Sequence, residues 1–244
     1  MANVSSSPTL ATCTFSQNSA SYGGGMHNDS SSPTLTNSIF FGNSAVYGHG
    51  GGMYNDESSP ALSNCTFAGN SADDTADGML NLSSSPTLTN CILWNSDAED
   101  SENEVINSSD ATPIFSYCDI RGSFNEGVWN ERFGTDEGNN IDHDPLFVRN
   151  PGTNGEDDPG DLHLTAESPC IDAGDPSITD GQDMDGEVRV FDGNEDGTAI
   201  IDIGADEFVV SNNDGDGSDG GNGGSKGSGS SGGCFINTLF GAVE

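Results

Sequence analysis

The side chains of this sequence best suited to chemistry are oxygen ligands for a hard cation. Residues 192–197 read Asp-Gly-Asn-Glu-Asp-Gly, the opening of a calcium loop in which alternate oxygens face the ion and the glycine allows a sharp turn. The match ends at Ile203, where such a loop has a bidentate glutamate. The candidate calcium ligands are Asp192, Asn194 and Asp196, with Asp183 and Asp185 upstream completing the set. The alternative is a pair of Asp-Gly turns in an acidic surface.

Groups for covalent or acid–base catalysis are sparse. A polysaccharide lyase needs an arginine or lysine base beside carboxylates or calcium, but the first basic residue is Arg121. The others are Arg132, Arg149, Arg189 and Lys226. The aspartates within 73–77 are expected in a loop, and the Asp-His-Asp run at 142–144 overlaps a phrase better explained as structural. We therefore expect no catalytic residues, with polysaccharide cleavage as the minor alternative.

A repeat of about 26 residues must position these groups, because the same columns recur along the first half of the chain. Its prolines are separated by 25, 27, 26 and 27 residues: Pro8, Pro33, Pro60, Pro86 and Pro113. Five residues after each stand Cys13, Ser38, Cys65, Cys91 and Cys118, and two further on Phe15, Phe40, Phe67, Leu93 and Ile120. A second column is Met1, Met26, Met53, Met79 and Val105, each followed by Asn3, Asn28, Asn55, Asn81 and Asn107.

The unit predicts an all-β, right-handed parallel β-helix, a solenoid like that of pectate lyases, of about five coils. It lacks the three- and four-residue apolar spacing of helices and contains short alternating pieces between turn residues. Such pieces become stable when stacked on their copies at ~4.8 Å, with inward residues forming one core. A β-sandwich and a propeller are the alternatives, but a propeller blade needs about 40 residues. A mixed β/loop module and a disordered tail are expected to follow.

The cysteines do not form a recognisable disulfide framework. Four of the six share one inward column, where parallel stacked side chains do not readily reach the disulfide dihedral, so we expect small apolar core residues. A strained bridge between Cys65 and Cys91 remains open.

The charge is extreme, with 40 acidic residues against 5 basic ones and a formal net charge of −35. Residues 123–208 hold 23 of the acids, and residues 1–95 hold 6. Such a surface repels nucleic acid and anionic membranes. It suits either solubility in salt or the binding of divalent cations.

Two segments resemble known bacterial surface proteins. Residues 23–45 and 50–72 (GGGMHNDSSSPTLTNSIFFGNSA and GGGMYNDESSPALSNCTFAGNSA) are similar to the glycine-rich and F-x-x-N repeats of chlamydial polymorphic outer-membrane proteins. The phrases DPLF, DLHL, SPCIDAGDP and DIGADEF, within residues 144–208, resemble the C-terminal module of "choice-of-anchor Q" proteins. These resemblances imply export, a right-handed β-helix, and attachment to or release from the cell surface.

The chain divides into four predicted parts. Residues 1–122 form the β-helix, 123–208 the acidic module, 209–233 a Gly/Ser/Asp linker and 234–244 a short apolar motif. Around Cys234 the motif is either a processing or attachment signal, or the start of something longer; it is too short to span a bilayer. The chain opens in mid-repeat, so a signal peptide is expected further upstream.

Three functions follow as hypotheses. The first is a noncatalytic secreted or cell-surface scaffold, adhesin-like, with polysaccharide or protein ligands and no nucleic acid. The second is a polysaccharide-binding or polysaccharide-cleaving β-helix. The third is a calcium-dependent structural segment of a larger exoprotein.

Overall fold

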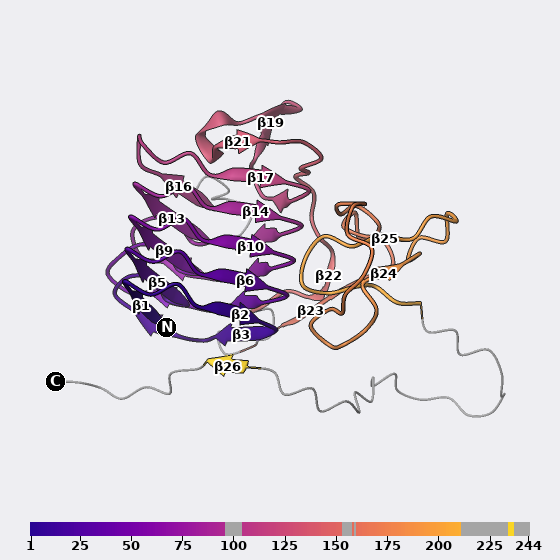
Figure 1. Cartoon of the computed structure of the whole chain (residues 1–244), viewed down its shortest axis with the longest axis horizontal. Helices are drawn as coiled ribbons and strands as arrows, with labels where there is room; N and C mark the ends of the chain where they lie inside the picture. Colours follow the sequence, from indigo (N-terminus) through magenta and orange to yellow (C-terminus); the bar gives the residue numbers. More distant parts are fainter. Residues whose placement is uncertain (96–103, 153–157, 159, 211–233, 237–244) are drawn as a thin grey trace.

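The computed structural model shows a solenoid of short stacked strands with a loop-rich module against one side (Figure 1). It describes residues 1–95, 104–152, 158, 160–210 and 234–236. The predicted linker from residue 211 on, and the terminal motif except for 234–236, lie outside the described residues.

Four parallel sheets build the solenoid, each taking one strand from successive coils. Sheet A contains β1 (Ala2–Val4), β5 (Met26–Asp29), β9 (Met53–Asp56), β13 (Met79–Leu82) and β16 (Val105–Asn107). Sheet B contains β2 (Thr9–Ala11), β6 (Thr34–Thr36), β10 (Ala61–Ser63), β14 (Thr87–Thr89), β17 (Ile114–Ser116) and β21 (Thr135–Asp136). Sheet C contains β18 (Asp119–Ile120), β15 (Ile92–Trp94), β11 (Thr66–Ala68), β7 (Ile39–Phe41), β3 (Cys13–Ser16) and β26 (Cys234–Ile236). Sheet D contains β12 (Ser71–Ala72), β8 (Ser44–Ala45) and β4 (Ser19–Ala20).

The register of these sheets places each predicted column in a line. In sheet C, Phe40 pairs with Phe15 on one side and Phe67 on the other. Their rings stack at centroid distances of 4.4 Å and interplanar angles of 4° and 2°, so neighbouring coils contact through flat faces. The cysteine column is buried as predicted, at Cys13, Cys65, Cys91 and Cys118. All six cysteines are free, so the bridge left open between the second and third of these is not formed.

Two ladders of asparagines, all of them buried except Asn107, run along the solenoid axis. In the first, each side-chain amide donates to the amide oxygen of the next coil, through Asn3, Asn28, Asn55, Asn81 and Asn107. The second runs through Asn18, Asn43, Asn70 and Asn95 and ends on the Glu104 carboxylate. Stacking thus satisfies polar groups that would otherwise be costly to bury.

The chain after the last full coil forms short antiparallel pairs and loops. The pairs are β19 (Phe124–Asn125) with β20 (Val128–Trp129), β22 (Phe147–Arg149) with β23 (Asp161–Leu164), and β24 (Val190–Phe191) with β25 (Ile200–Ile201). A 3₁₀ turn, η2 (Glu131–Phe133), precedes β21. Because β21 pairs in parallel with β17, stacked pairing continues beyond residue 122, where the sequence pattern fades.

The C-terminal module packs on the outer face of sheet C, as Figure 1 shows for β22 to β25. A second apolar core fills this contact. The solenoid contributes Ile39, Ala68 and Ile92, and the module contributes Phe147, Leu162, Leu164, Cys170, Ile171, Ile203 and Ala205. The module is therefore held by apolar burial on a solenoid face that would otherwise be solvent-exposed.

Candidate functional site

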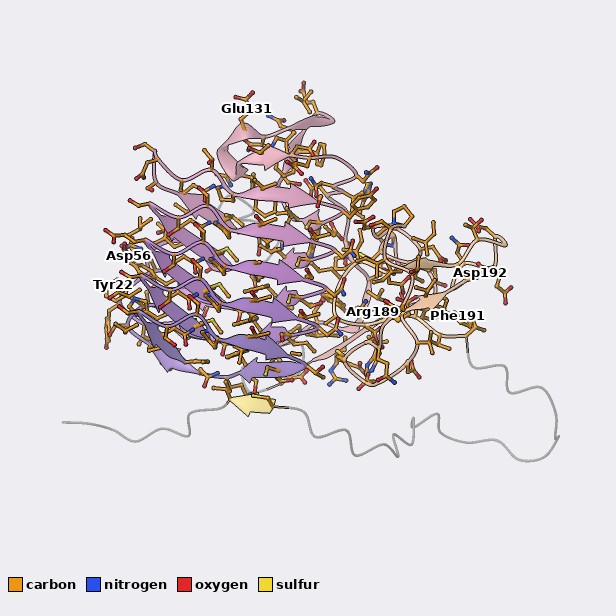
Figure 2. The ribbon with its side chains drawn as sticks, viewed as in Figure 1. Tyr22, Asp56, Glu131, Arg189, Phe191 and Asp192 are labelled. Atoms are coloured by element: carbon orange, nitrogen blue, oxygen red, sulfur yellow. The ribbon has the colours of Figure 1, made fainter. Side chains whose placement is uncertain are left out.

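The predicted calcium loop closes on its own backbone. The two carboxylate oxygens of Asp192 accept hydrogen bonds from the amides of Asp196 and Gly197, at 3.0 and 2.9 Å. The Asn194 side-chain oxygen accepts from the same Asp196 amide at 2.9 Å. Figure 2 shows Asp192 on the side of the module away from the solenoid. The Asp196 carboxylate instead accepts from the Thr198 amide at 2.8 Å. The three candidate residues thus lie on one stretch of chain whose side-chain oxygens accept from nearby backbone amides, as in Asx turns.

The two upstream candidates have other partners. Asp183 is buried and accepts from the backbone amides of Asp185, Glu187 and Glu207. Asp185 instead turns its carboxylate to the imidazole of His163. These contacts show that Asp183 holds its own loop together and joins it to Glu207 in the DIGADEF phrase, whereas Asp185 belongs to a different cluster.

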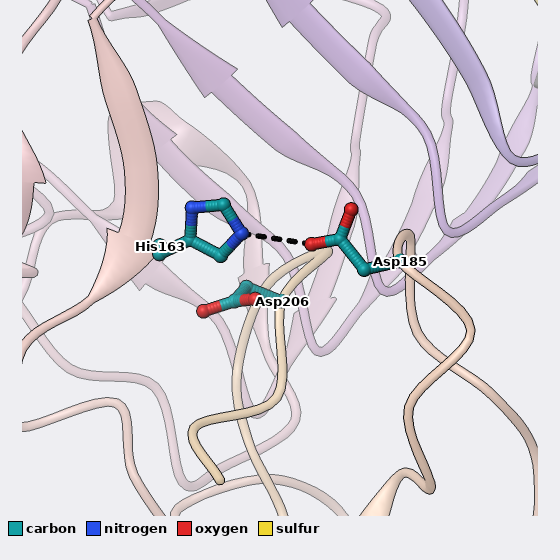
Figure 3. Close-up of side chains that lie close together, drawn as sticks. All are labelled: His163, Asp185 and Asp206. Atoms are coloured by element: carbon teal, nitrogen blue, oxygen red, sulfur yellow. Dashed lines mark hydrogen bonds and ion pairs between the residues drawn. The ribbon is translucent and has the colours of Figure 1, made fainter. Parts of the chain in front are cut away.

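That cluster brings a histidine and two aspartates together from three segments (Figure 3). His163 lies on β23, Asp185 on the 183–187 loop and Asp206 in the DIGADEF phrase. Their ligand atoms all lie within 4.8 Å of one another. Nε2 of His163 is 2.8 Å from Asp185, and Nδ1 contacts Asp161. One imidazole and two carboxylates form a donor set that binds zinc and related metals in proteins.

The electrostatics of this cluster favour a proton on the imidazole. The Asp185 hydrogen bond, followed by Asp161, raises the pKa of His163 to about 10. Both ring nitrogens then donate to carboxylates, and the imidazolium supplies the cation that the acidic surroundings require. As it stands, the cluster is an ion-pair clamp that joins β23 to two loops.

A buried charged network lies beneath the clamp and centres on Arg189. This guanidinium is 1% exposed and donates to the backbone oxygens of Asp206 and Gly204 and to the side chain of Asn37 on the solenoid. Glu207 lies 3.8 Å away and accepts from the amides of Phe191 and Asp202. Burial raises the pKa of Glu207 to about 9. Through the hydrogen bond from Arg189 to Asn37, this network holds the module against the solenoid.

Asp202 has a similar structural role. Its carboxylate oxygens accept from the amides of Asp172 and Phe208, and burial raises its pKa to about 7. The Asp202 carboxylate therefore links the SPCIDAGDP phrase, which contains Asp172, to the DIGADEF phrase, which contains Phe208.

The Asp-His-Asp run at 142–144 is also used structurally. The Asp142 carboxylate accepts from the amides of Gly122 and Phe124, and the carboxylate of Asp144 accepts from the Leu146 amide. The His143 amide donates to Asp119, a fully buried carboxyl that also accepts from the Cys170 thiol. These hydrogen bonds join the last coil to the module.

The solenoid carries an aromatic surface formed by strands β5 and β9 of sheet A and by the turns that precede them, on the side away from the module (Figure 2). The ring centroid of Tyr22 lies 5.3 Å from that of Tyr54 and 5.9 Å from that of His49. The His27 ring lies edge-on to the Tyr54 ring, with a centroid distance of 4.9 Å. Asp29 and Asp56 stand in register beside them. We call these six residues the aromatic patch. Desolvation, then Asp56, raises the pKa of Tyr54, so its hydroxyl remains a hydrogen-bond donor.

Sequence reasoning missed His163 and the aromatic patch. The sequence did contain a signal for His163: Asp161 and His163 are two residues apart on one strand, so both side chains lie on the same face. The signal for the aromatic patch was that residues one coil apart, such as His27 and Tyr54, form a column like that of the neighbouring asparagines. Both were overlooked because their residue types vary along the chain.

Comparison with known proteins supports the fold. A family model described as a right handed beta helix region matches residues 1–144. No curated protein and no solved structure matches the chain. Together with the parallel register, the family match confirms the predicted right-handed parallel β-helix. In the described part of the chain, no helix is long and apolar enough to cross a membrane.

Proposed function

Since this chain belongs to the right-handed β-helix family, we propose that it is a noncatalytic, adhesin-like scaffold of the cell surface or the secreted fraction. The observation that carries the proposal is the regular stack of sheets A to C, whose side chains repeat from coil to coil. Five strands at ~4.8 Å spacing form a rod about 20 Å long. Such a rod displays the same groups at fixed intervals without needing a catalytic centre.

The distribution of basic residues supports a role that does not include cleavage of uronate polymers. No lysine or arginine occurs before Arg121, so the regular coils lack the usual base for lyase chemistry. The resemblances to chlamydial outer-membrane repeats and to choice-of-anchor proteins support export and surface attachment. They are the reason for proposing an extracellular scaffold.

Binding of a polysaccharide is the second candidate, and the aromatic patch favours it. Its rings offer apolar faces, and its carboxylates accept hydrogen bonds from hydroxyls. Asp29 and Asp56 also make the patch anionic, so a neutral polysaccharide fits better than a uronate polymer.

Three measurements test these proposals. Incubation with polygalacturonate and calcium should give no unsaturated product, and sustained production of it would contradict the noncatalytic scaffold. Binding of neutral and acidic polysaccharides should be compared between the native chain and Tyr22→Ala/Tyr54→Ala. Loss of binding in the variant would favour the second candidate.

Export is tested by antibody labelling of intact source cells, since labelling only after lysis would contradict surface display.

A further inference from the structure

The cluster of His163, Asp185 and Asp206 has the donor atoms and the spacing of a metal site. Among the described residues it is the one group of three such side chains whose donor atoms all lie within 4.8 Å of one another. A tetrahedral zinc ion at ~2.0–2.2 Å from each ligand places neighbouring ligand atoms roughly 3.3 Å apart. Nε2 of His163 already lies 2.8 Å from Asp185, and Figure 3 shows Asp206 beside the same ring. Small side-chain rotations are therefore enough to hold an ion.

The imidazole is oriented for coordination by a further carboxylate. Asp161, two residues earlier on β23, contacts Nδ1 of His163. Histidines that bind metals commonly donate the proton of the other ring nitrogen to a carboxylate, which fixes the tautomer and strengthens the ligand. This contact directs Nε2 of His163 toward Asp185 (Figure 3). It is an observation separate from the spacing of the three donor atoms.

Asp206 adds a buried carboxylate that retains bonding capacity. Its side chain lies in a residue that is 5% exposed, and Oδ2 accepts from the Leu164 amide at 2.8 Å. Within the described part of the chain, no donor forms a hydrogen bond with its other carboxylate oxygen. The side chains of His163 and Asp185 are 50% and 49% exposed, so an ion can enter from solvent. Oδ1 of Asp206 is therefore free to bind it.

Backbone contacts hold the two loops of the cluster in place without an ion. The Asp183 carboxylate accepts from the amides of Asp185 and Glu207, at 2.9 and 3.2 Å. The guanidinium of Arg189 donates to the backbone oxygen of Asp206 at 3.3 Å. Because these contacts fix the chain on either side of the cluster, an ion would lose little affinity to the ordering of its ligands.

We propose that Nε2 of His163 and the carboxylates of Asp185 and Asp206 bind one divalent transition-metal ion of the zinc type, with solvent in the remaining position. The imidazole distinguishes this ion from calcium and magnesium, which prefer oxygen ligands. In the structure Nε2 donates to Asp185; the ion takes the place of that proton, which is released to solvent. The bound ion joins β23 to the 183–187 loop and to the DIGADEF phrase. This proposal does not depend on the scaffold function.

The first test measures binding of zinc chloride to the chelator-treated full chain by calorimetry. All chains carry Cys234→Ser, because that exposed thiol is itself a zinc ligand. The chain should bind one equivalent of Zn²⁺. Asp161→Asn should weaken the affinity roughly 10–100-fold, as expected for a residue that orients a ligand. His163→Ala and Asp206→Asn should weaken it further, because each removes a direct ligand.

Two matched controls separate this site from the acidic surface around it. His143→Ala removes an exposed imidazole, and Asp196→Asn removes an exposed carboxylate from the predicted calcium loop. Both variants should bind Zn²⁺ as the parent chain does, and a large excess of Ca²⁺ should leave Zn²⁺ in place. Equal losses of affinity in the controls and in His163→Ala would overturn the proposal. Displacement of Zn²⁺ by Ca²⁺ would also overturn it, since the ligands would then be oxygens alone.

The second test needs no change in the cluster. The chain has four histidines, so Zn²⁺ should shift the imidazole resonances of one of them in the nuclear magnetic resonance spectrum. The spectrum of His163→Ala identifies that histidine by the loss of its signals. Zinc binding that leaves the His163 signals unchanged, or that shifts all four histidines alike, would place the ion elsewhere and refute the proposal. This result holds even if Asp206→Asn does not fold.

Discussion

At the level of single residues, the asparagine side chains of the first ladder join successive coils by hydrogen bonds in the interior, as the backbone groups do in the sheets. Asn55 donates to Asn81 at 2.9 Å and accepts from Asn28 at 2.8 Å, and all three are fully buried. Each amide therefore has its neighbours in adjacent coils as partners. A mismatch between coils would leave a donor and an acceptor unpaired, so the ladder selects the register.

Replacing Asn55 by alanine should destabilise the solenoid by about 2–4 kcal/mol, because the buried amides of both neighbouring coils lose a partner. Asn3→Ala is the matched control, since Asn3 ends the ladder and bonds only Asn28 within it. The midpoint of urea unfolding should fall clearly for the first variant and about half as far for the second. Equal shifts would show that the ladder does not act as a chain of paired groups.

The calcium hypothesis also belongs to single residues. If Asp192, Asn194 and Asp196 bind the ion, millimolar Ca²⁺ should raise the melting temperature, since a ligand of the native state stabilises it by mass action. Asp192→Ala/Asp196→Ala should lose most of that shift, whereas a shift retained there but lost in His163→Ala would move the site to the histidine cluster. An equal shift from sodium at matched ionic strength would indicate screening alone.

At the scale of the strand, glycines decide how closely coils approach. A Cβ on Gly52 would lie 2.7 Å from the Gly78 oxygen and 2.7 Å from the Phe67 ring, and Gly25 and Gly78 hold equivalent positions before β5 and β13. Such contacts are too short for a side chain. The glycines before the methionine column are therefore needed for space.

Gly52→Ala should cost about 1–3 kcal/mol or more, because the coil must shift away from its neighbour. Gly127→Asn is the control: Gly127 has a φ of +80°, which asparagine tolerates, and nothing lies within 4 Å of its Cβ position. Thermal unfolding followed by circular dichroism measures both. A control as unstable as Gly52→Ala would refute the argument from close approach.

The strands of the solenoid could be predicted because one set of inward positions repeats. Residues such as Phe40 and Asn55 each recur one coil away, and stacking at a fixed spacing follows from that repetition. Sheet D was not anticipated, although Ser19-Ala20, Ser44-Ala45 and Ser71-Ala72 recur in the same way. Small side chains give a weaker signal because they alternate little in hydrophobicity.

The packing of the module on sheet C was not predicted from the sequence. One signal was present: Ile39, Ala68 and Ile92 are apolar residues on a face that an isolated solenoid would expose to solvent. The partners on the module come from irregular loops, whose positions depend on long-range contacts such as that of Arg189 with Asn37. No local period encodes such contacts.

At the scale of the whole molecule, negative charge opposes folding in two ways. The net charge of −35 repels across the surface. In addition, several carboxyls are buried where solenoid and module meet. Burial raises the pKa of Asp119 to about 8 and that of Asp206 to about 6. The interface between the two parts is therefore the place where pH should act on stability.

The direction follows from proton binding. The pKa of Asp119 lies near its ordinary value of 3.8 in the unfolded chain and at about 8 in the folded chain. Between these two pKa values the native state holds a proton on Asp119 that the unfolded state has released. The contribution of Asp119 to the free energy of unfolding is therefore fully present at low pH and is lost as pH rises through about 8. Each unit of separation is worth about 1.4 kcal/mol, so the urea midpoint should drop between pH 5 and pH 8.

Asp119→Asn should flatten much of that drop. The amide imitates the protonated carboxyl, because its oxygen still accepts from the His143 amide and its nitrogen can face the Cys170 thiol. Measuring both proteins in 0.5 M NaCl, roughly a concentration at which surface charges are screened, separates the buried carboxyl from general repulsion. If the variant lost as much stability from pH 5 to pH 8 as the native chain, Asp119 would not be the group that couples docking of the module to pH. In that case the remaining buried carboxyls, Asp202 and Asp206 first, would have to carry the effect, since their folded pKa values of about 7 and about 6 lie in the same window.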